Sequence, residues 1–151
     1  MTAINDYFIL CVDDDSEDLE MLQEALEEVA PHISILKAGD GEEALLLLQE
    51  MKEISRLPSL VVLDINMPKV NGLDVLARLR ADPRTSLLPV VMLTSSAEER
   101  DLVAAYLNHA NSYIRKPVDF DQFTHAVQQL GLYWLVLNQP PPRPTPAPPA
   151  D

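Results

Sequence analysis

The sequence predicts a doubly wound α/β domain built on a five-stranded parallel sheet. Five short apolar runs alternate with five segments of helical periodicity along the 151 residues. Uninterrupted apolar runs are typical of parallel strands that are buried on both faces. Strict alternation of strand and helix favours right-handed crossovers, which cover both faces of one sheet with helices. A chain of this length suffices for one domain with a substantial core.

The first strand is predicted over residues 7–12 and the first helix over residues 16–30. Leucines recur on one face of this helix, and glutamates occupy the remaining positions. Asp15 or Ser16 can cap the first turn, where acidic side chains also suit the helix dipole. Pro31 ends the helix, because proline cannot continue the hydrogen-bond pattern.

The second strand, 33–36, leads through a glycine-containing turn into a helix over 42–51. The third strand, 59–63, precedes a helix over 72–81, which an Asp-Pro pair closes. The fourth unit is a strand over 89–94 and a helix over 97–109. The remaining elements are a strand over 112–115 and a long helix that opens at Asp119 or Phe120.

The domain is expected to cover residues 1–138. Residues 139–151 form a separate tail, in which 7 of 13 residues are proline and no apolar period is visible. Such a segment cannot build a core, so we expect it to be extended and disordered. Because no effector segment follows residue 138, we expect the output to pass through a partner protein, a phosphorelay step or dimerisation.

The net charge of −13 argues against nucleic-acid binding, which needs a basic surface. It also disfavours binding to anionic membranes. No apolar stretch reaches membrane-spanning length, and the N-terminus does not resemble a signal peptide. We therefore expect a cytoplasmic protein with no membrane and no nucleic-acid partner.

Polar residues follow four of the predicted strands at the point where each strand ends. They are Asp13, Asp14, Asp15, Asp64, Thr94 and Lys116. The carboxyl ends of parallel strands gather at one edge of the sheet, so these side chains are expected to converge there. Crowded carboxylates repel one another, and binding a cation relieves that repulsion. Hard oxygen ligands favour Mg²⁺, with Mn²⁺ as an alternative.

Phosphoryl chemistry suits this set of side chains. A magnesium ion that keeps most of its waters usually acts on phosphate. The Thr94 hydroxyl and the Lys116 ammonium both suit phosphoryl oxygens. The chain has only 4 glycines and no P-loop pattern, which disfavours a nucleotide cradle. The simplest reaction is phosphoryl transfer onto an aspartate.

Each of these residues also has an ordinary structural explanation. Asp64 fits a turn, Asp14 a helix cap, Thr94 a strand end and Lys116 a surface position before proline. For the site to be absent, all four explanations must hold together at one edge of the sheet. That conjunction favours the functional interpretation.

Four motifs then carry a family resemblance. They are Val12-Asp13-Asp14-Asp15, Leu63-Asp64-Ile65-Asn66-Met67-Pro68, Leu93-Thr94-Ser95-Ser96 and Ser112-Tyr113-Ile114-Arg115-Lys116-Pro117. In this order and in this strand–helix frame, they resemble the receiver domain of two-component response regulators. The resemblance covers residues 5–138 and implies a flavodoxin-like (βα)5 fold.

The resemblance implies that Asp64 is the phosphoacceptor and takes a phosphoryl group from the phosphohistidine of a sensor histidine kinase. It implies that Asp14 and Asp64 bind Mg²⁺ directly and that Asp13 acts partly through water. The backbone carbonyl of Asn66 would be a further ligand.

The remaining roles also come from the resemblance. Lys116 would pair with the phosphoaspartate, and its peptide bond to Pro117 would be cis. Thr94 would close on the phosphoryl group, and Tyr113 would move with it as a second switch residue. The chain would catalyse only its own phosphorylation and dephosphorylation, and it would not otherwise be an enzyme.

Other segments narrow the resemblance to single-domain regulators that accompany bacterial phytochromes and related sensor kinases. These segments are Asp82-Pro83-Arg84-Thr85, Glu98-Glu99-Arg100-Asp101-Leu102, Asn111-Ser112-Tyr113 and Gly131-Leu132-Tyr133-Trp134-Leu135. The triple aspartate departs from that pattern, in which two acids usually precede a residue such as asparagine. Strand phasing makes Asp13 and Asp14 the metal-binding pair and leaves Asp15 as a helix cap.

The end of the last helix predicts a self-association surface. Every residue from Leu132 to Leu137 is apolar. A helix end that is apolar on all sides needs cover on more than one side. We therefore expect a homodimer built on the last helix and its neighbours.

Two alternatives remain at this point. A pseudo-receiver would keep the fold and bind a partner without phosphorylation, although that class usually lacks one of the key residues and none is missing here. A haloacid-dehalogenase-type phosphatase also uses a strand-end aspartate with magnesium. It needs a second aspartate two residues later, where this chain has Asn66.

Overall fold

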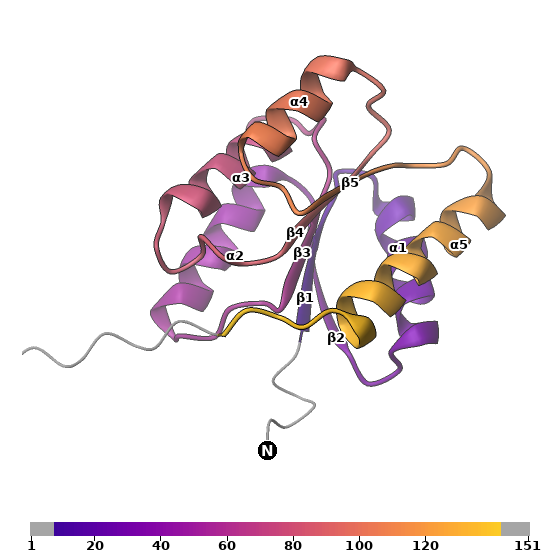
Figure 1. Ribbon diagram of the computed structural model, residues 1–151, viewed down its shortest axis with the longest axis horizontal. Helices are drawn as coiled ribbons and strands as arrows, with labels where there is room; N and C mark the ends of the chain where they lie inside the picture. The colour runs from indigo at the N-terminus through magenta and orange to yellow at the C-terminus, as the bar shows by residue number, and fades with distance from the viewer. Residues whose placement is uncertain (1–7, 143–151) are drawn as a thin grey trace, which may run out of the picture.

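The computed structural model describes residues 8–142 and has one parallel sheet covered by helices on both faces (Figure 1). The strand order is β2-β1-β3-β4-β5. The strands are β1 (Phe8–Val12), β2 (Ser34–Ala38), β3 (Leu60–Leu63), β4 (Val90–Thr94) and β5 (Ser112–Arg115). The predicted doubly wound five-stranded fold is confirmed.

Five α-helices alternate with these strands. They are α1 (Ser16–Val29), α2 (Gly41–Glu53), α3 (Gly72–Ala81), α4 (Glu99–Leu107) and α5 (Phe120–Gly131). In Figure 1, α1 and α5 cover one face of the sheet, and α2, α3 and α4 cover the other. The chain then continues from α5 into a π-helical segment, η2 (Leu132–Leu137).

The core consists of two apolar layers, one on each face of the sheet. Along β1, Ile9 and Cys11 point toward α1 and α5, whereas Leu10 and Val12 point toward α2 and α3. All four side chains are buried. Burying a large apolar side chain contributes about 1.5–3 kcal/mol each, so the central strands supply much of the driving force for folding.

The edge strands differ from the sequence prediction that every strand is buried on both faces. In β2 only Ala38 is buried, and in β5 no residue is fully buried. Each edge strand has a neighbour on one side only, so its side chains are less covered. The central strands β1, β3 and β4 are buried along their whole length, as predicted.

Helix α4 is shorter than the predicted 97–109. It begins at Glu99 and ends through a left-handed residue, His109, with φ of 62°. The His109 amide donates to Tyr106 O, and the Ala110 amide donates to Ala105 O, both at 3.0 Å. This pattern is a Schellman motif, which normally places glycine at the left-handed position. The carboxyl end of α4 is therefore set by a strained residue.

Within residues 8–142, no helix is long and apolar enough to cross a membrane. Most of the predicted proline-rich tail, from residue 143 onward, lies outside the described residues. The predicted domain boundary near residue 138 stays a prediction.

Candidate phosphorylation and metal site

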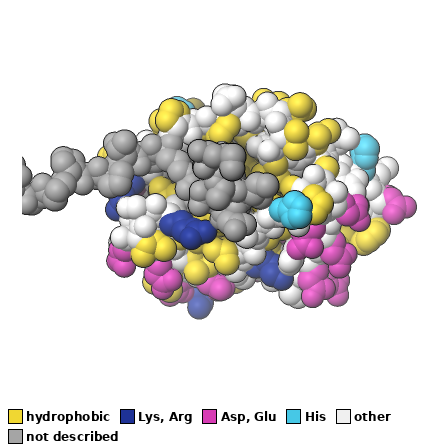
Figure 2. Space-filling view, turned by 90° about the horizontal axis from the view of Figure 1, so that it is seen from below, with side chains coloured by type: hydrophobic (Ala, Val, Ile, Leu, Met, Phe, Trp, Pro, Cys, Tyr) yellow, Lys and Arg dark blue, Asp and Glu magenta, His cyan; other side chains and the backbone are white. Residues whose placement is uncertain are grey.

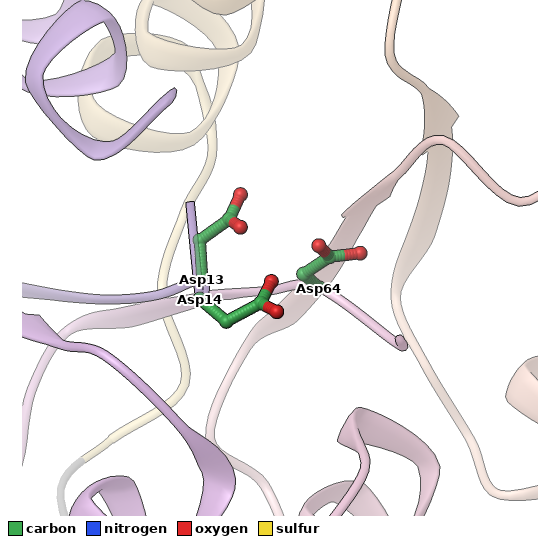
Figure 3. Close-up of side chains that lie close together, drawn as sticks. All are labelled: Asp13, Asp14 and Asp64. Carbon is green, nitrogen blue, oxygen red and sulfur yellow. The ribbon is translucent and has the colours of Figure 1, made fainter. Parts of the chain in front are cut away.

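Three aspartates meet at the carboxyl edge of the sheet. Asp13 and Asp14 follow β1, and Asp64 follows the neighbouring strand β3. One carboxylate oxygen from each lies within 4.8 Å of the others. In Figure 3 the Asp14 side chain extends toward Asp64, with Asp13 beside them. Asp13 and Asp64 are buried, whereas Asp14 is exposed.

Backbone pairing fixes the two buried aspartates. The Asp13 amide donates to Ala38 O at 3.1 Å, and the Asp64 amide donates to Val12 O at 3.0 Å. These bonds extend the strand ladders past the ends of β1 and β3. The side chains of Asp13 and Asp64 are thereby held by the sheet itself, which is more rigid than a free loop.

Local backbone bonds then orient individual carboxylates. Asp13 Oδ1 accepts the Asp15 amide at 3.0 Å, and Asp64 Oδ1 accepts the Ile65 amide at 2.7 Å. Asp15 points away from this cluster and caps α1, where its Oδ1 accepts the amides of Glu17 and Asp18. The prediction that Asp15 is a helix cap is confirmed.

Gly72 allows α3 to begin directly beside Asp64. A Cβ atom at this position would overlap the carbonyl group of Asp64. The Gly72 amide donates to Ile65 O at 2.8 Å, which fixes this close approach. A larger residue would have to push the segment after β3 away, and Asp64 with it.

Lys116 lies at the centre of the acidic cluster. Its Nζ lies 2.5 Å from Asp13 Oδ2, 2.9 Å from Asp18 Oδ2 and 3.3 Å from Asp64 Oδ2. The Lys116 amide donates to Thr94 O at 2.8 Å, which extends the pairing of β4 and β5. The lysine side chain is only 9% exposed, so its ammonium depends on these carboxylates for compensation.

The sequence alone assigns no role to Asp18. The residue lies in the first turn of α1, immediately after the Asp15 cap, and its amide donates to Asp15. A signal was present, because a helix that starts at the carboxyl edge of the sheet presents its first turn to the site. Sequence alone does not show which residue of that turn points at Lys116.

The pKa values reflect burial and crowding. Burial raises the pKa of Asp13 to about 6, with the charge of Asp64 acting in the same direction and the bond from Lys116 opposing both. For Lys116, burial on its own would lower the pKa, but the bonds to Asp13 and Asp18 and the charge of Asp64 outweigh it and raise the pKa. Three carboxylates share one ammonium, and the carboxylate of Asp14 lies beside them, so the site carries excess negative charge.

This donor set suits a divalent metal ion. Asp13, Asp14 and Asp64 offer hard oxygen ligands close to one another, and nitrogen or sulfur ligands are absent from the cluster. Magnesium and manganese prefer such ligands. Asn66 lies two residues after Asp64 and is exposed. The role of its backbone carbonyl stays a prediction.

Thr94 and Tyr113 each form a hydrogen bond with the backbone of Ser96. Buried Thr94 accepts the Ser96 amide at its Oγ1, 3.2 Å away, and the Tyr113 hydroxyl donates to Ser96 O at 3.1 Å. Ser96 Oγ in turn donates to Asp101 Oδ2 of α4 at 2.6 Å. The structure thus connects both predicted switch residues to the loop between β4 and α4.

Tyr113 is only partly buried. Burial raises the pKa of its hydroxyl, and the nearby charges of Asp101 and Asp64 add to the shift, while the contact with Ser96 opposes it. The group is therefore a neutral hydrogen-bond donor at neutral pH. Its role as a switch stays a prediction.

The expected cis bond between Lys116 and Pro117 is wrong. Every peptide bond within residues 8–142 is trans. The trans form is the default even before proline. The Lys116 ammonium reaches Asp13, Asp18 and Asp64 in this conformation, so contact with the cluster does not require the cis form.

A family model of the response regulator receiver domain matches residues 9–128. The chain belongs to this family. The predicted family is therefore confirmed, and it is a family of two-component signalling proteins, not a class of classical enzymes.

Two relatives match over most of their length. The probable methanogenesis regulatory protein FilR2 of Methanothrix harundinacea is 35% identical over 142 residues, which cover 93% of this chain and 92% of FilR2. The response regulator Rcp1 of Synechocystis is 35% identical over 129 residues, which cover 84% of this chain and 88% of Rcp1.

Two solved structures share the fold and bear on the site. The phosphorylated cyanobacterial phytochrome response regulator RcpA superposes with a TM-score of 0.84 and 34% identity, over 90% of this chain and 99% of RcpA. The Mn²⁺-bound form of Rcp1 gives a TM-score of 0.84 and 33% identity, over the same shares of the two chains. A phosphorylated state and a manganese-bound state are thus described for similar proteins.

Proposed function

We propose that this response regulator is phosphorylated on Asp64 and that phosphorylation changes its affinity for a partner protein. The observation that carries the proposal is the buried Asp64 carboxylate, held beside Asp13, Asp14 and Lys116. An Asp64 oxygen would attack the phosphorus of a phosphohistidine. The new O–P bond would form as the P–N bond breaks, and Lys116 would offset the added negative charge.

Mg²⁺ is the proposed cofactor, and Mn²⁺ is the proposed substitute. Asp13, Asp14 and Asp64 would hold the ion, together with the backbone carbonyl of Asn66. When bound, it would neutralise carboxylate charge and polarise the phosphoryl group. The Mn²⁺-bound form of Rcp1 and the donor set of this chain support this assignment.

Thr94 and Tyr113 are the proposed switch residues. The phosphoryl group adds about 1.5–2 negative charges and three acceptor oxygens at Asp64. The Thr94 hydroxyl would turn toward these oxygens and release the Ser96 amide, which it now accepts. Tyr113, bonded to Ser96 O, would move with the same loop. Such a switch typically supplies about 1–3 kcal/mol of coupling.

The direct test is labelling with acetyl phosphate. With Mg²⁺ present, the unsubstituted protein should gain one phosphoryl group by intact-mass analysis, and Asp64→Asn should gain none. Asp15→Asn is the matched control, because Asp15 is a neighbouring acid that caps α1. It should label like the unsubstituted protein. Labelling of Asp64→Asn would refute the assignment.

That experiment and a phosphatase assay separate the alternatives. Absence of Mg²⁺-dependent labelling by any donor would support a phosphorylation-independent pseudo-receiver. Continuous turnover of a phosphomonoester would support a haloacid-dehalogenase-type phosphatase. The asparagine two residues after Asp64 argues against the phosphatase, since it cannot serve as the general acid.

A sensor histidine kinase is the proposed phosphoryl donor, with bacterial phytochromes as the specific candidates. The name of RcpA, a phytochrome response regulator, supports this choice. FilR2, 35% identical, is instead named as a probable methanogenesis regulatory protein. A comparison of phosphotransfer from purified phytochrome kinases with phosphotransfer from kinases without a chromophore domain would show which class of kinase is the donor. Preferential transfer from the latter would refute the phytochrome assignment.

A homodimer through the last helix region is also proposed. In η2, Trp134 and Leu135 pack partly against the core, whereas Tyr133, Val136 and Leu137 are more than half exposed. The segment borders a groove of about 390 Å³ at the amino ends of the strands. Figure 2 views the molecule from that end, where hydrophobic side chains lie among polar and charged ones. Apolar exposure of this kind is typical of an interaction surface.

Light scattering tests the dimer. Leu137→Asp should yield a monomeric mass at micromolar concentration. Leu87→Asp is the control, because Leu87 is equally exposed, at 69% against 68%, but lies between α3 and β4. It should leave the mass unchanged. A monomeric mass for the unsubstituted protein, phosphorylated or not, would refute the dimer.

The remaining proposals concern location and output. We propose a cytoplasmic protein that signals by protein contact, not by binding nucleic acid or membranes. The net charge of −13 supports both exclusions, since both surfaces are polyanionic. Measurable DNA binding at physiological salt would contradict this proposal.

A further inference from the structure

The Lys116 ammonium is shared among three carboxylates from three different elements. Asp13 follows β1, Asp64 follows β3, and Asp18 lies in the first turn of α1. We propose that Asp18 is a positioning residue that competes with the phosphoryl group for Lys116 and so weakens phosphoryl binding at Asp64. This inference rests on the proposed phosphorylation of Asp64.

The distances show how strongly Asp18 engages the lysine. Lys116 Nζ lies nearer to Asp18, at 2.9 Å, than to Asp64, at 3.3 Å. The Asp18 amide is tied to the capping residue Asp15 at 3.2 Å, so the side chain projects from a fixed helix turn. The lysine is 9% exposed and the Asp18 side chain 27%, so water screens this pair only partly.

An ammonium group has three N–H donors, and three carboxylates already accept them. A phosphoryl oxygen can therefore bond to Lys116 only by replacing one acceptor or by sharing a proton with it. Asp64 is the proposed phosphoryl carrier and Asp13 a proposed metal ligand. Asp18 has neither role, so its bond is the one that must weaken.

Charge acts in the same direction as hydrogen bonding. The phosphoryl group brings further negative charge to a cluster that already holds four carboxylates and one ammonium. Asp18 both repels that charge and retains the cation that would offset it. Replacing Asp18 with a neutral isostere should therefore favour phosphoryl binding.

The probe is beryllofluoride, a non-covalent mimic of the phosphoryl group, titrated at fixed Mg²⁺ concentration and followed by ¹⁹F NMR. Asp18→Asn should bind it about tenfold more tightly, the change that one charge-assisted hydrogen bond typically makes. Glu17→Gln is the matched control. It removes an equal charge from the same helix turn, at an exposed residue that is not among the ion-pair partners of Lys116 within the described chain.

Two further measurements separate competition for Lys116 from a general effect of charge or structure. Mg²⁺ affinity is measured by calorimetry without beryllofluoride, and Asp18→Asn should change it by less than about threefold. In a Lys116→Met background, Asp18→Asn should improve beryllofluoride binding no more than Glu17→Gln does, because only the general effect of charge remains once the shared ammonium is gone. Circular dichroism identifies any variant that fails to fold. If Lys116→Met does not fold, the difference in beryllofluoride affinity between Asp18→Asn and Glu17→Gln, read with their Mg²⁺ affinities, decides.

The proposed competition of Asp18 for Lys116 would be overturned if Asp18→Asn and Glu17→Gln raised beryllofluoride affinity equally. It would also be overturned if Asp18→Asn did not raise that affinity. A gain explained entirely by tighter Mg²⁺ binding would also overturn it. Failure of the unsubstituted protein to bind beryllofluoride would instead refute the proposed phosphorylation site, and the role of Asp18 with it.

Discussion

Arg80 at the end of α3 connects two loops at the amino ends of β4 and β5. Its guanidinium donates to the carbonyls of Leu88 at 2.8 Å and His109 at 3.0 Å and to Asn111 Oδ1 at 3.0 Å. It also makes two longer bonds, of 3.2 and 3.4 Å, to the loop between α3 and β4. No other residue type offers this planar fork of donors. Replacing Arg80 should therefore loosen both loops at once.

The expected cost follows from the three shorter bonds. Each well-formed hydrogen bond contributes about 1 kcal/mol net, so Arg80→Met should lower the free energy of unfolding by about 3 kcal/mol. Methionine preserves much of the apolar stem, so lost packing adds little. Arg80→Lys keeps the charge but only one bond of comparable geometry, and it should restore about 1 kcal/mol.

The assay is urea unfolding followed by tryptophan fluorescence, since Trp134 is the sole tryptophan and packs partly against the core. Arg78→Met is the control, because Arg78 lies on the same helix but is exposed. It should change stability by less than about 0.5 kcal/mol. If Arg80→Met and Arg78→Met unfold at the same urea concentration, the connecting role of Arg80 is refuted.

Three smaller predictions follow from single contacts. His109→Gly should stabilise the protein by about 0.5–1 kcal/mol in the same assay, because glycine adopts the positive φ without strain; a loss of stability would contradict this. Lys52 and the Arg84 amide lower the pKa of Asp82 below its ordinary 3.8. The stabilisation that the ionised Asp82 carboxylate gives to the folded state is therefore present above about pH 4 and disappears as the pH falls through the lowered pKa. Asp82→Asn should therefore cost about 1 kcal/mol at pH 7, and this cost should shrink as the pH falls through the lowered pKa of Asp82, whereas a pH-independent cost would exclude the ion pair. Burial raises the pKa of Cys11 to about 12, so its thiol should react with Ellman's reagent at pH 8 only after unfolding; rapid native labelling would contradict its burial.

The central strands and the helix starts could be predicted because their causes are local. Residues 90–93 form an unbroken apolar run, and Asp15 and Asp40 are capping residues directly before helices. The end of β2 was harder to predict from the sequence, because the extent of this strand depends on its pairing with a neighbouring strand. It runs to Ala38, beyond the predicted 36, since Lys37 and Ala38 pair with Cys11 and Val12 of β1.

The convergence of Asp13, Asp14, Asp64 and Lys116 could also be predicted, because the order of parallel strands brings their carboxyl ends together. The contact between Lys116 and Asp18 could not. It depends on the rotation of α1 about its own axis, which packing of the leucine face against the sheet determines. The Ser96 connection between Tyr113 and Asp101 is equally non-local, since it joins β5 to α4 through one loop residue.

The three consecutive aspartates have identical side chains, but their positions in the fold give them different burial and different partners. Asp13 continues the ladder of β1 and is buried, Asp14 points outward, and Asp15 turns back to cap α1. Asp13 therefore bears the cost of desolvation, which is why its pKa rises although Lys116 lies 2.5 Å away. A single ammonium cannot neutralise Asp13, Asp14, Asp18 and Asp64 together. The carboxylates of the unmodified site therefore repel one another, and a divalent cation should reduce that repulsion. On this reasoning, a phosphoryl group on Asp64 depends on the cation, because it adds negative charge to a site that already has too much.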